Sequence, residues 1–448
     1  MALRHRSRYF QAMKPRRLRD AERNPLALDI ASLGREGAGL AFHDGKRIYV
    51  PGALAGEEVR AVPTDQLDRD ILRATLEDVV CPSPDRVKPP CAHYTACGGC
   101  TLQHLAIPAY RAWKGATVRE QLARLNTAPV HWDEPLFIDA GTRRRASFAV
   151  IKRSRRVLVG FHGHRSHRMA EIESCLLVRP KLSAVLERSK PWLARLLRDG
   201  QAAGLFIQDV SGATEAVLTG PLERTARPAE QAEAFAGWAA ALGLSRIAWR
   251  PQERDEPETM IALHPLVARF AGLSVPLPPG AFLQPSLEGE RALSETVLAY
   301  LAGAALPSGA GVADLFAGCG TFSGPLLALG PVHAVEMALS PVAALKAAKA
   351  GPRLTVEQRN LFTRPLLAPE LQRFGAVVLD PPRAGAEAQA SALAGSGVRV
   401  VVYVSCNPAA LAKDAAILMR AGFAFRRARL IDQFIWSAHS ELVALFSR

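Results

Sequence analysis

The chain has 448 residues, of which 49% are apolar and 22% are charged, and its net charge is +14. This length exceeds one ordinary hydrophobic core and favours about three globular domains. The longest apolar runs are strand-sized, and the basic start Met1–Leu18 has no apolar centre, so we expect neither a membrane span nor a secretory signal. We expect a cytoplasmic monomer, although an organellar transit peptide could share that start.

The positive charge is concentrated in a few short segments. These segments are Arg4–Arg19, Arg143–Arg145, Lys152–Arg156 and Arg165–Arg168. The middle segments flank strand-like stretches at 146–151 and 157–161, which would present cations along a sheet for phosphate contacts. We therefore expect a nucleic-acid partner, and the alternative is an ordinary solvated basic surface.

The N-terminal part divides into a basic arm, residues 1–23, and a small all-β module, residues 24–80. Short alternating segments are separated by glycine turns, and Asp44-Gly45 between two of them is a strong hairpin signal. Five short strands of this kind predict a barrel of the OB type, which is a common platform for nucleic acids.

Residues 81–279 predict a second, central β-rich domain that begins with the proline-rich linker 81–90. A helix is predicted at His104–Leu125, where apolar residues recur at helical spacing. Strands then predominate, and two further helices are predicted at 182–199 and 229–242.

Residues 280–448 alternate between helical and strand-like patterns. Predicted helices cover 288–302, 322–329, 341–350 and 408–420, and predicted strands cover 311–316, 332–336, 376–379, 398–404 and 442–446. This alternation is typical of a doubly wound, Rossmann-like α/β domain.

A glycine-rich turn, Asp314–Phe322, joins a predicted strand of this domain to a predicted helix. Glycines at such a turn let the backbone approach a cofactor closely. Glu336 ends the next strand, where its carboxylate can accept hydrogen bonds from ribose hydroxyls. The pattern serves both nicotinamide cofactors and S-adenosylmethionine, and the lack of a third phosphate-loop glycine favours the methyl donor. A turn that binds nothing is the remaining alternative.

Three reactive side chains lie at the ends of other strands. Asp380 begins an Asp-Pro-Pro-Arg segment, Cys406 follows the strand 398–404, and Glu441 precedes the last strand. Ligands of open α/β sheets bind beyond the carboxyl ends of the strands, so we expect Asp380 and Cys406 in one cleft. A carboxylate at Glu441 could act there as a general base, although an exposed Glu is more often merely solvated.

The turn after Cys406 places its sulfur at the start of a helix. Asn407 can cap that helix and Pro408 can be its first residue, so the positive end of the helix dipole would favour the thiolate. From this position alone, a small buried cysteine is an equally good interpretation.

Four other cysteines suggest a metal centre. Cys91, Cys97 and Cys100 lie on one glycine-containing loop, and Cys175 is distant in the sequence. Such a set can enclose zinc or an iron–sulfur cluster, and the spacing alone does not choose between them. The odd total of seven cysteines argues against a disulfide framework, and free thiols are the other interpretation.

In combination, these motifs resemble the RNA uracil-5-methyltransferase family, from about Pro25 to Phe446. The matching segments are Cys91–Cys100, Phe282–Ser286, Asp314–Gly320, Asp380–Arg383, Tyr403–Pro408 and His439–Glu441. Residues 28–52 also resemble the TRAM domain of that family, an RNA-binding barrel. The resemblance implies a class I S-adenosylmethionine-dependent methyltransferase domain at 280–448.

The resemblance also implies roles for individual residues. Cys406 would be the nucleophile that adds to uracil C6, and Glu441 would be the base. A [4Fe-4S] cluster would be held by Cys91, Cys97, Cys100 and Cys175. The implied methyl-donor contacts are Gln284, Phe316, Glu336, Asn360 and Asp380. The helix 104–125 would pack on the catalytic domain. Thr321 stands where the family often has Asn, so no cofactor role is assigned to it.

Several alternatives differ in the substrate or in the activity itself. Family members that have both the TRAM domain and the cysteine cluster mostly modify large-subunit ribosomal RNA, which favours 23S rRNA over tRNA. An RNA cytosine-5 methyltransferase also attacks C6 through cysteine, but its Pro-Cys motif is not found around Cys406. An adenine N6 enzyme would have an aromatic residue where Arg383 stands. The non-enzyme alternative is a catalytically silent RNA-binding or assembly factor.

Overall fold

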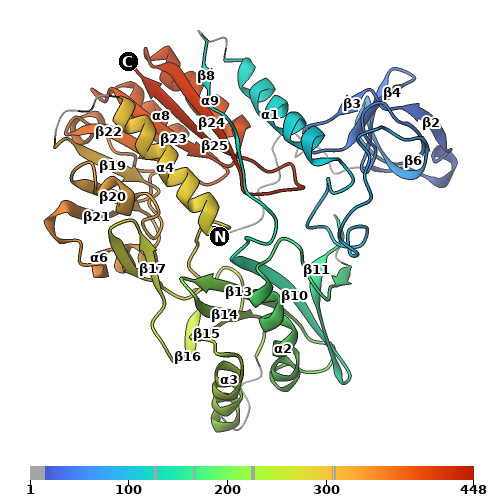
Figure 1. Cartoon of the computed structure of the whole chain (residues 1–448), viewed down its shortest axis with the longest axis horizontal. Coiled ribbons are helices and arrows are strands. Elements are labelled where there is room, and N and C mark those ends of the chain that lie inside the picture. Colours follow the sequence, from blue (N-terminus) through green and yellow to red (C-terminus); the bar gives the residue numbers. More distant parts are fainter. Residues whose placement is uncertain are drawn as a thin grey trace.

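The computed structural model describes residues 16–448 except 126–128, 165, 167, 223–227, 305, 307 and 308. The chain forms an all-β lobe, a central β-sheet with two helices, and a large α/β lobe (Figure 1). The arm before Arg16, with most of the first arginine cluster, lies outside the described residues, as do Arg165 and His167. None of the described helices is long and apolar enough to cross a membrane.

The all-β lobe is one strongly curved sheet. Its strands are β1 (Arg16–Arg17), β2 (Leu26–Asp29), β3 (Ser32–Leu33), β4 (Gly39–His43), β5 (Lys46–Val50), β6 (Glu58–Asp68) and β7 (Ile71–Cys81). The prediction of five short strands over 24–80 is wrong, because β6 and β7 form a long hairpin that brings the number in that fully described range to six. Strand β1, from the predicted arm, pairs with β6.

The β4–β5 hairpin confirms the turn predicted at Asp44-Gly45. Both residues have positive φ angles, 48° and 72°, which suits the twist of a two-residue hairpin. Alternate residues of the strands, including Ala41 and Ile48, point into a shared apolar core.

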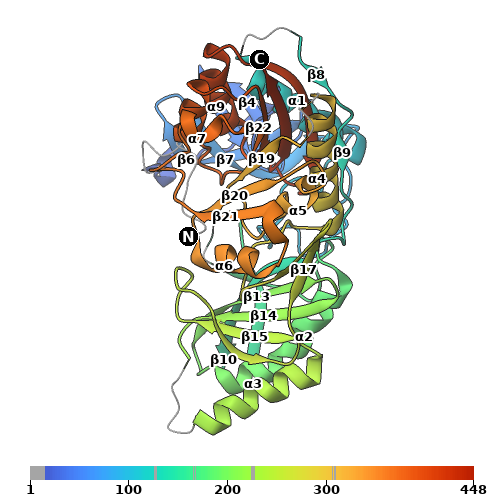
Figure 2. The same ribbon diagram turned by 90° about the vertical axis from the view of Figure 1, so that its left-hand side faces the viewer.

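The central lobe is a sheet with the strand order β12-β11-β10-β13-β14-β15-β16. Its strands are β10 (Arg145–Arg153), β11 (Arg156–His162), β12 (Met169–Glu171), β13 (Ala202–Val210), β14 (Ala213–Thr219), β15 (Arg246–Arg250) and β16 (Glu258–Ala262). Helices α2 (Pro180–Leu196) and α3 (Pro228–Leu242) pack on it and on each other, which confirms both helices predicted from the sequence. Figure 2 shows both helices on the outer side of this sheet.

Some segments that precede residue 280 belong by their contacts to the α/β lobe. Strands β8 (His131–Trp132) and β9 (Leu136–Phe137) pair with a C-terminal strand, β24. The hairpin of β17 (Val267–Phe270) and β18 (Leu273–Pro276) packs on helices α5 and α6 of that lobe. Helix α1 (Ile107–Ala123) packs against α9, and Figure 1 shows it between the all-β lobe and the C-terminal sheet.

The C-terminal sheet has the order β21-β20-β19-β22-β23-β25-β24-β8. Its main strands are β19 (Gly311–Leu315), β20 (Val332–Glu336), β21 (Leu354–Gln358), β22 (Phe374–Leu379), β23 (Val400–Ser405), β24 (Ala424–Asp432) and β25 (Glu441–Ser447). Strands β19 to β23 are parallel, whereas β25 runs antiparallel to both β23 and β24. This is the strand arrangement of a class I methyltransferase, and it confirms the predicted α/β fold.

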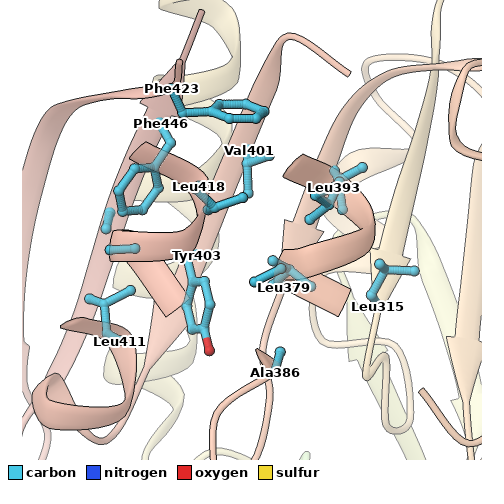
Figure 3. Packing of buried hydrophobic residues seen from close by; sticks show 14 of the residues in the cluster. Leu315, Leu379, Ala386, Leu393, Val401, Tyr403, Leu411, Leu418, Phe423 and Phe446 are labelled. Carbon is cyan, nitrogen blue, oxygen red and sulfur yellow. The ribbon is translucent and has the colours of Figure 1, made fainter. Parts of the chain in front are cut away.

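Helices cover both faces of this sheet. They are α4 (Leu287–Gly303), α5 (Ser323–Leu326), α6 (Leu339–Ala347), α7 (Ala368–Leu371), α8 (Glu387–Ala394) and α9 (Pro408–Arg420). The helix expected at 408–420 is confirmed at those bounds, whereas strands β21 and β24 were not predicted. Figure 3 shows Leu379, Val401 and Tyr403 packed against Leu418 and Leu393. The Tyr403 hydroxyl donates to Asp414 Oδ2 at 2.6 Å, so this buried phenol is satisfied.

The buried carboxylate Glu57 ties the all-β lobe to the linker that follows it. It accepts hydrogen bonds from the amides of Leu54 and Ser83 and from the guanidinium of Arg86, which also donates to the Gly52 carbonyl. Removing the partner of a buried charge costs about 3–5 kcal/mol. We expect Arg86→Met to lower the unfolding free energy by about that amount in urea denaturation.

Arg60→Met is the matched control for that substitution. Arg60 pairs with Glu77 on the surface, where both side chains are exposed. Its loss should cost at most about 1 kcal/mol. Equal effects of the two substitutions would contradict the role assigned to Glu57.

Candidate active site

Cys406 and Glu441 face one another at one edge of the C-terminal sheet. Cys406 directly follows β23, and Glu441 is the first residue of the antiparallel β25. In the register, Ser405 is opposite Leu442, so the next residue along β23 meets the residue that begins β25. Asp380 directly follows the neighbouring strand β22. The topology thus brings the three predicted side chains together at the carboxyl ends of β22 and β23.

The electrostatic environment of Cys406 favours the neutral thiol. Burial, the carboxylate of Glu441 and that of Asp380 raise the pKa of Cys406 to about 12, while Arg383 acts in the opposite direction. Asn407 does cap helix α9, with its Oδ1 accepting from the Ala409 amide at 3.2 Å. The expectation that this turn favours the thiolate is nevertheless wrong for the protein by itself, because burial beside two carboxylates outweighs the helix terminus.

Glu441 is also held toward its neutral form. Its side chain is buried, and burial together with Asp380 raises its pKa well above the ordinary value, against the influence of Arg383 and Arg145. A carboxylate with a raised pKa is a stronger proton acceptor once it is ionised.

The glycine turn lies at the switch point of the sheet, where the strand order reverses between β19 and β22. The Gly318 amide donates to Glu336 Oε2 at 3.0 Å, and Gly318 has a φ angle of +55°. Gly320 has a φ angle of +97°, and a Cβ there would lie 2.7 Å from the side chain of Leu345. Gly320 therefore requires glycine and Gly318 favours it, and the turn fixes Glu336 at its mouth.

A cluster of carboxylates lies beneath this turn. Asp314 is fully buried, its Oδ2 accepts from Ser323, and its Oδ1 has no partner among the described residues. Burial is the main cause that raises its pKa to about 7, and Glu336 adds to the effect. Burial and Asp314 likewise raise the pKa of Asp380 to about 7. Three acidic groups around one crevice suit a positively charged ligand.

The other predicted cofactor contacts lie on two sides of this region. Phe316 follows β19 with a φ angle of +64°, and its ring centroid lies 5.4 Å from that of Phe362. Asn360 Oδ1 accepts from the Phe362 amide at 3.0 Å. Gln284 is buried, and its Oε1 accepts from Gln433 in the segment between β24 and β25.

The four predicted ligand cysteines come together at the edge of the central lobe. Burial is the largest cause that raises the pKa of Cys100 to about 11, and Cys175, Cys97 and Cys91 each add to it. The Gly99 amide donates to Cys97 Sγ at 3.4 Å. No group of three or more His, Cys, Asp or Glu side chains within the described residues is arranged to hold a metal ion.

The arginines of the segment 143–145 do not form a solvated phosphate-binding cluster, contrary to expectation. Arg144 is buried, pairs with Glu290 and donates to the Gln284 carbonyl at 3.0 Å. Arg143 is near Cys175 and Cys100, and the Arg145 guanidinium stacks over Phe282 at 4.1 Å. Arg144 is buried because the segment enters the contact between the central and C-terminal lobes, whereas Arg143 and Arg145 are half-buried at its margin.

A basic groove does lie farther along the central sheet. It has a volume of about 880 Å³ and is lined by Arg17, Ile151, Arg153, Leu158, Ser166, Arg168 and Met169. The cations come from the arm, from β10 and from the segment before β12. Of the basic segments predicted around these strands, Arg153 and Arg168 thus contribute to an open surface between the arm and the central sheet, whereas Lys152 donates to the carbonyls of Ala194 and Leu197.

Comparison with known proteins finds RNA methyltransferases that align with nearly the whole chain. A family model described as tRNA (uracil-5-)-methyltransferase matches residues 356–448. An uncharacterized RNA methyltransferase of Brucella melitensis is 37% identical, covering 94% of this chain and 97% of the relative. The 23S rRNA (uracil(1939)-C(5))-methyltransferase RlmD of Halomonas elongata is 36% identical, covering 93% of this chain and 88% of the relative. The chain belongs to the RNA uracil-5-methyltransferase family.

A solved structure supports the fold of this family member. The Pyrococcus abyssi tRNA (uracil-54, C5)-methyltransferase, in complex with S-adenosyl-L-homocysteine, superposes with a TM-score of 0.71 and 19% identity. The superposition covers 94% of this chain and 99% of the Pyrococcus abyssi chain. Family membership is consistent with Cys406 opposite Glu441 and favours uracil over the cytosine and adenine alternatives.

Some site residues had no assigned role in the sequence-based prediction. Arg383 acts on the pKa of both Cys406 and Glu441, and its position in the Asp-Pro-Pro-Arg motif was the available signal. Asp314 opens the glycine turn, but only its burial shows that one oxygen is unpartnered.

The opposition of Cys406 and Glu441 predicts a change in thiol reactivity. The Glu441 carboxylate is one of the causes that raise the pKa of the Cys406 thiol, so Glu441→Gln should lower that pKa and speed alkylation at pH 9 several-fold. The measurement is the iodoacetamide rate of the Cys406 peptide by mass spectrometry. Glu387→Gln, which removes an exposed carboxylate on α8, should leave that rate unchanged.

Proposed function

We propose that this protein transfers a methyl group from S-adenosylmethionine to C5 of a uridine in 23S rRNA. The observation that carries the proposal is the opposition of Cys406 and Glu441 at the same sheet edge as Asp380. A thiol and a carboxyl group on two sides of one position are what addition to C6 and proton removal from C5 require.

The crevice at the glycine turn suits S-adenosylmethionine, which supplies an electrophilic methyl group when bound. Glu336, held by the Gly318 amide, is proposed to accept from the ribose hydroxyls, and the Phe316–Phe362 ring pair is proposed to contact the adenine. Asp314 and Asp380 provide negative charge for the cationic part of the ligand. The uncharged product should bind more weakly than the donor, because these buried carboxylates favour a cation.

The residues of the chain act in sequence on the uracil. Cys406 donates its sulfur electron pair to C6, which makes C5 nucleophilic. After methylation, Glu441 takes the proton from C5, the C5–C6 double bond re-forms, and the pair of the C6–S bond returns to Cys406. Asp380 and Arg383 adjust the charge around both groups. Because C6 is inaccessible in a stacked base, the target uridine must lie in a loop or be flipped outward.

The relatives whose names state a substrate favour ribosomal RNA over tRNA. RlmD proteins of two organisms are 36% identical to this protein over nearly the whole chain. The tRNA enzyme of similar fold is only 19% identical. The basic groove lined by Arg17, Arg153 and Arg168 is suitably placed for an RNA backbone between the arm and the central sheet.

The four cysteines are proposed to hold a [4Fe-4S] cluster. Cys91 and Cys175 both contribute to raising the pKa of Cys97 and that of Cys100, which supports the proximity of the four side chains. An amide donating to sulfur, as at Cys97, is typical of iron–sulfur centres.

The function predicts distinct outcomes for the two catalytic substitutions. Cys406→Ala should bind RNA but form no 5-methyluridine, because no adduct at C6 can form. Glu441→Gln should trap the methylated RNA on Cys406, which a denaturing gel with labelled RNA detects. The substrate is identified by mapping 5-methyluridine in the ribosomal and transfer RNA of a strain that lacks the gene. The same mapping is repeated after the wild-type gene or either variant is restored. Full turnover by Cys406→Ala would end the proposal.

The cluster predicts iron in protein purified without oxygen. We expect about four iron atoms and four sulfides per chain, together with the visible absorbance of an iron–sulfur protein. The Cys97→Ser variant should lose the iron, the sulfide and this absorbance. Cys81→Ser, which changes an exposed cysteine outside the set, is the control. Stoichiometric zinc without iron would contradict the assignment.

A further inference from the structure

The loop 433–440 connects β24 to β25 and ends at Glu441. It therefore determines where the proposed base lies relative to Cys406. Its backbone is held by two segments that lie more than 300 residues earlier in the chain, one on helix α1 and one directly after the cysteine loop.

Two buried side chains of α1, Tyr110 and Lys114, bind this loop and the last residue of β24. Lys114 Nζ donates to Asp432 Oδ1 at 2.6 Å and to the Ser437 carbonyl at 3.0 Å. The Tyr110 hydroxyl donates to Asp432 Oδ2 at 2.6 Å and accepts from Lys114 at 2.8 Å. Both also approach the Phe434 carbonyl at 3.3 Å. Every partner in this group lies on the loop or at the end of β24.

The segment after the cysteine loop binds the backbone of Trp436 in the loop 433–440. The amides of Thr101 and Leu102, the residues that follow Cys100, donate to the Trp436 carbonyl at 2.8 and 3.1 Å. Trp436 has a φ angle of +61°, a conformation that a bulky residue adopts only when its surroundings enforce it. Ile435 packs beside Leu102 and Tyr110 in a separate apolar cluster. The loop is thus fixed in a strained shape by contacts outside the C-terminal sheet.

The buried ion pair is poorly explained by stability alone. Lys114 and Asp432 have side chains only 2% and 1% exposed, so their desolvation offsets much of their attraction. What the pair provides is geometry, because the Lys114 ammonium group binds Asp432 and the carbonyls of the same turn, while the Tyr110 phenol donates its one proton to Asp432.

We infer that Lys114 and Tyr110 are positioning residues that clamp the loop 433–440 and thereby aim Glu441 at the C5 proton. The inference rests on the proposed function of Glu441. In the step concerned, Glu441 takes the C5 proton, the C5–H electron pair forms the C5–C6 double bond, and the C6–S pair returns to Cys406. A loosened loop slows this elimination more than the earlier methyl transfer, which does not use Glu441.

The test compares Tyr110→Phe with Tyr300→Phe. Tyr300 is equally buried, lies on α4, and its hydroxyl donates at 2.7 Å to Asp133, which pairs with Arg427 at the other end of β24. Each substitution removes one phenol–carboxylate hydrogen bond beside the same strand. In single-turnover reactions with labelled donor and RNA, Tyr110→Phe should transfer methyl at the normal rate but release the RNA about tenfold more slowly, as loss of one such bond allows.

The denaturation-resistant adduct should consequently accumulate in Tyr110→Phe and not in Tyr300→Phe. Equal behaviour of the two variants, whether both normal or both slowed, would overturn the clamp and leave the catalytic roles intact if Glu441→Gln still traps RNA. No methylation by the wild-type protein would overturn the function as well. Lys114→Met should show the same adduct, but it also strands a buried carboxylate and lowers stability, so Tyr110→Phe carries the decision.

Discussion

The antiparallel insertion of β25 is the constraint on which the candidate site depends. In a sheet of parallel strands, the first residue of each strand lies at the edge opposite the ligand crevice. Because β25 runs against β23 and β24, its first residue, Glu441, lies at the carboxyl edge beside Cys406 and Asp380. The backbone hydrogen bonds of β23 and β25 thus bring the proposed nucleophile and the proposed base side by side, and the loop before β25 orients the base within that register.

The same edge collects buried negative charge. Asp314, Asp380 and Glu441 all have raised pKa values, with burial as the first cause in each case. Such an arrangement is unfavourable for the protein by itself and becomes favourable when a cation binds among the carboxylates. A sulfonium donor satisfies that condition, and its charge would also oppose the carboxylates that hold Cys406 in its neutral form. Under the proposed function, the charge pattern would link donor binding to activation of Cys406.

Several segments from the first third of the chain contact the C-terminal lobe near this edge. The candidate site is therefore supported by residues that are distant from it in the sequence. Helix α1 packs on α9, strands β8 and β9 extend the sheet at β24, and the residues after Cys100 bind the loop before Glu441. The cysteine segment therefore touches the catalytic lobe directly. A metal centre there would stiffen the support of the base as well as the surface toward RNA.

Local patterns were sufficient to predict the class of fold, the glycine turn and the helix that starts at Pro408, because each depends on neighbouring residues and their period. Cys406 and Asp380 could likewise be placed at one edge from strand ends, whereas the place of Glu441 depends on the antiparallel course of β25. The folded arrangement was needed for the rest: the burial of Arg144, the raised pKa of Cys406, the transfer of β8 and β9 to the C-terminal sheet, and the clamp at Lys114. These features arise from burial and from contacts between residues hundreds of positions apart, which leave no periodic signal in the chain.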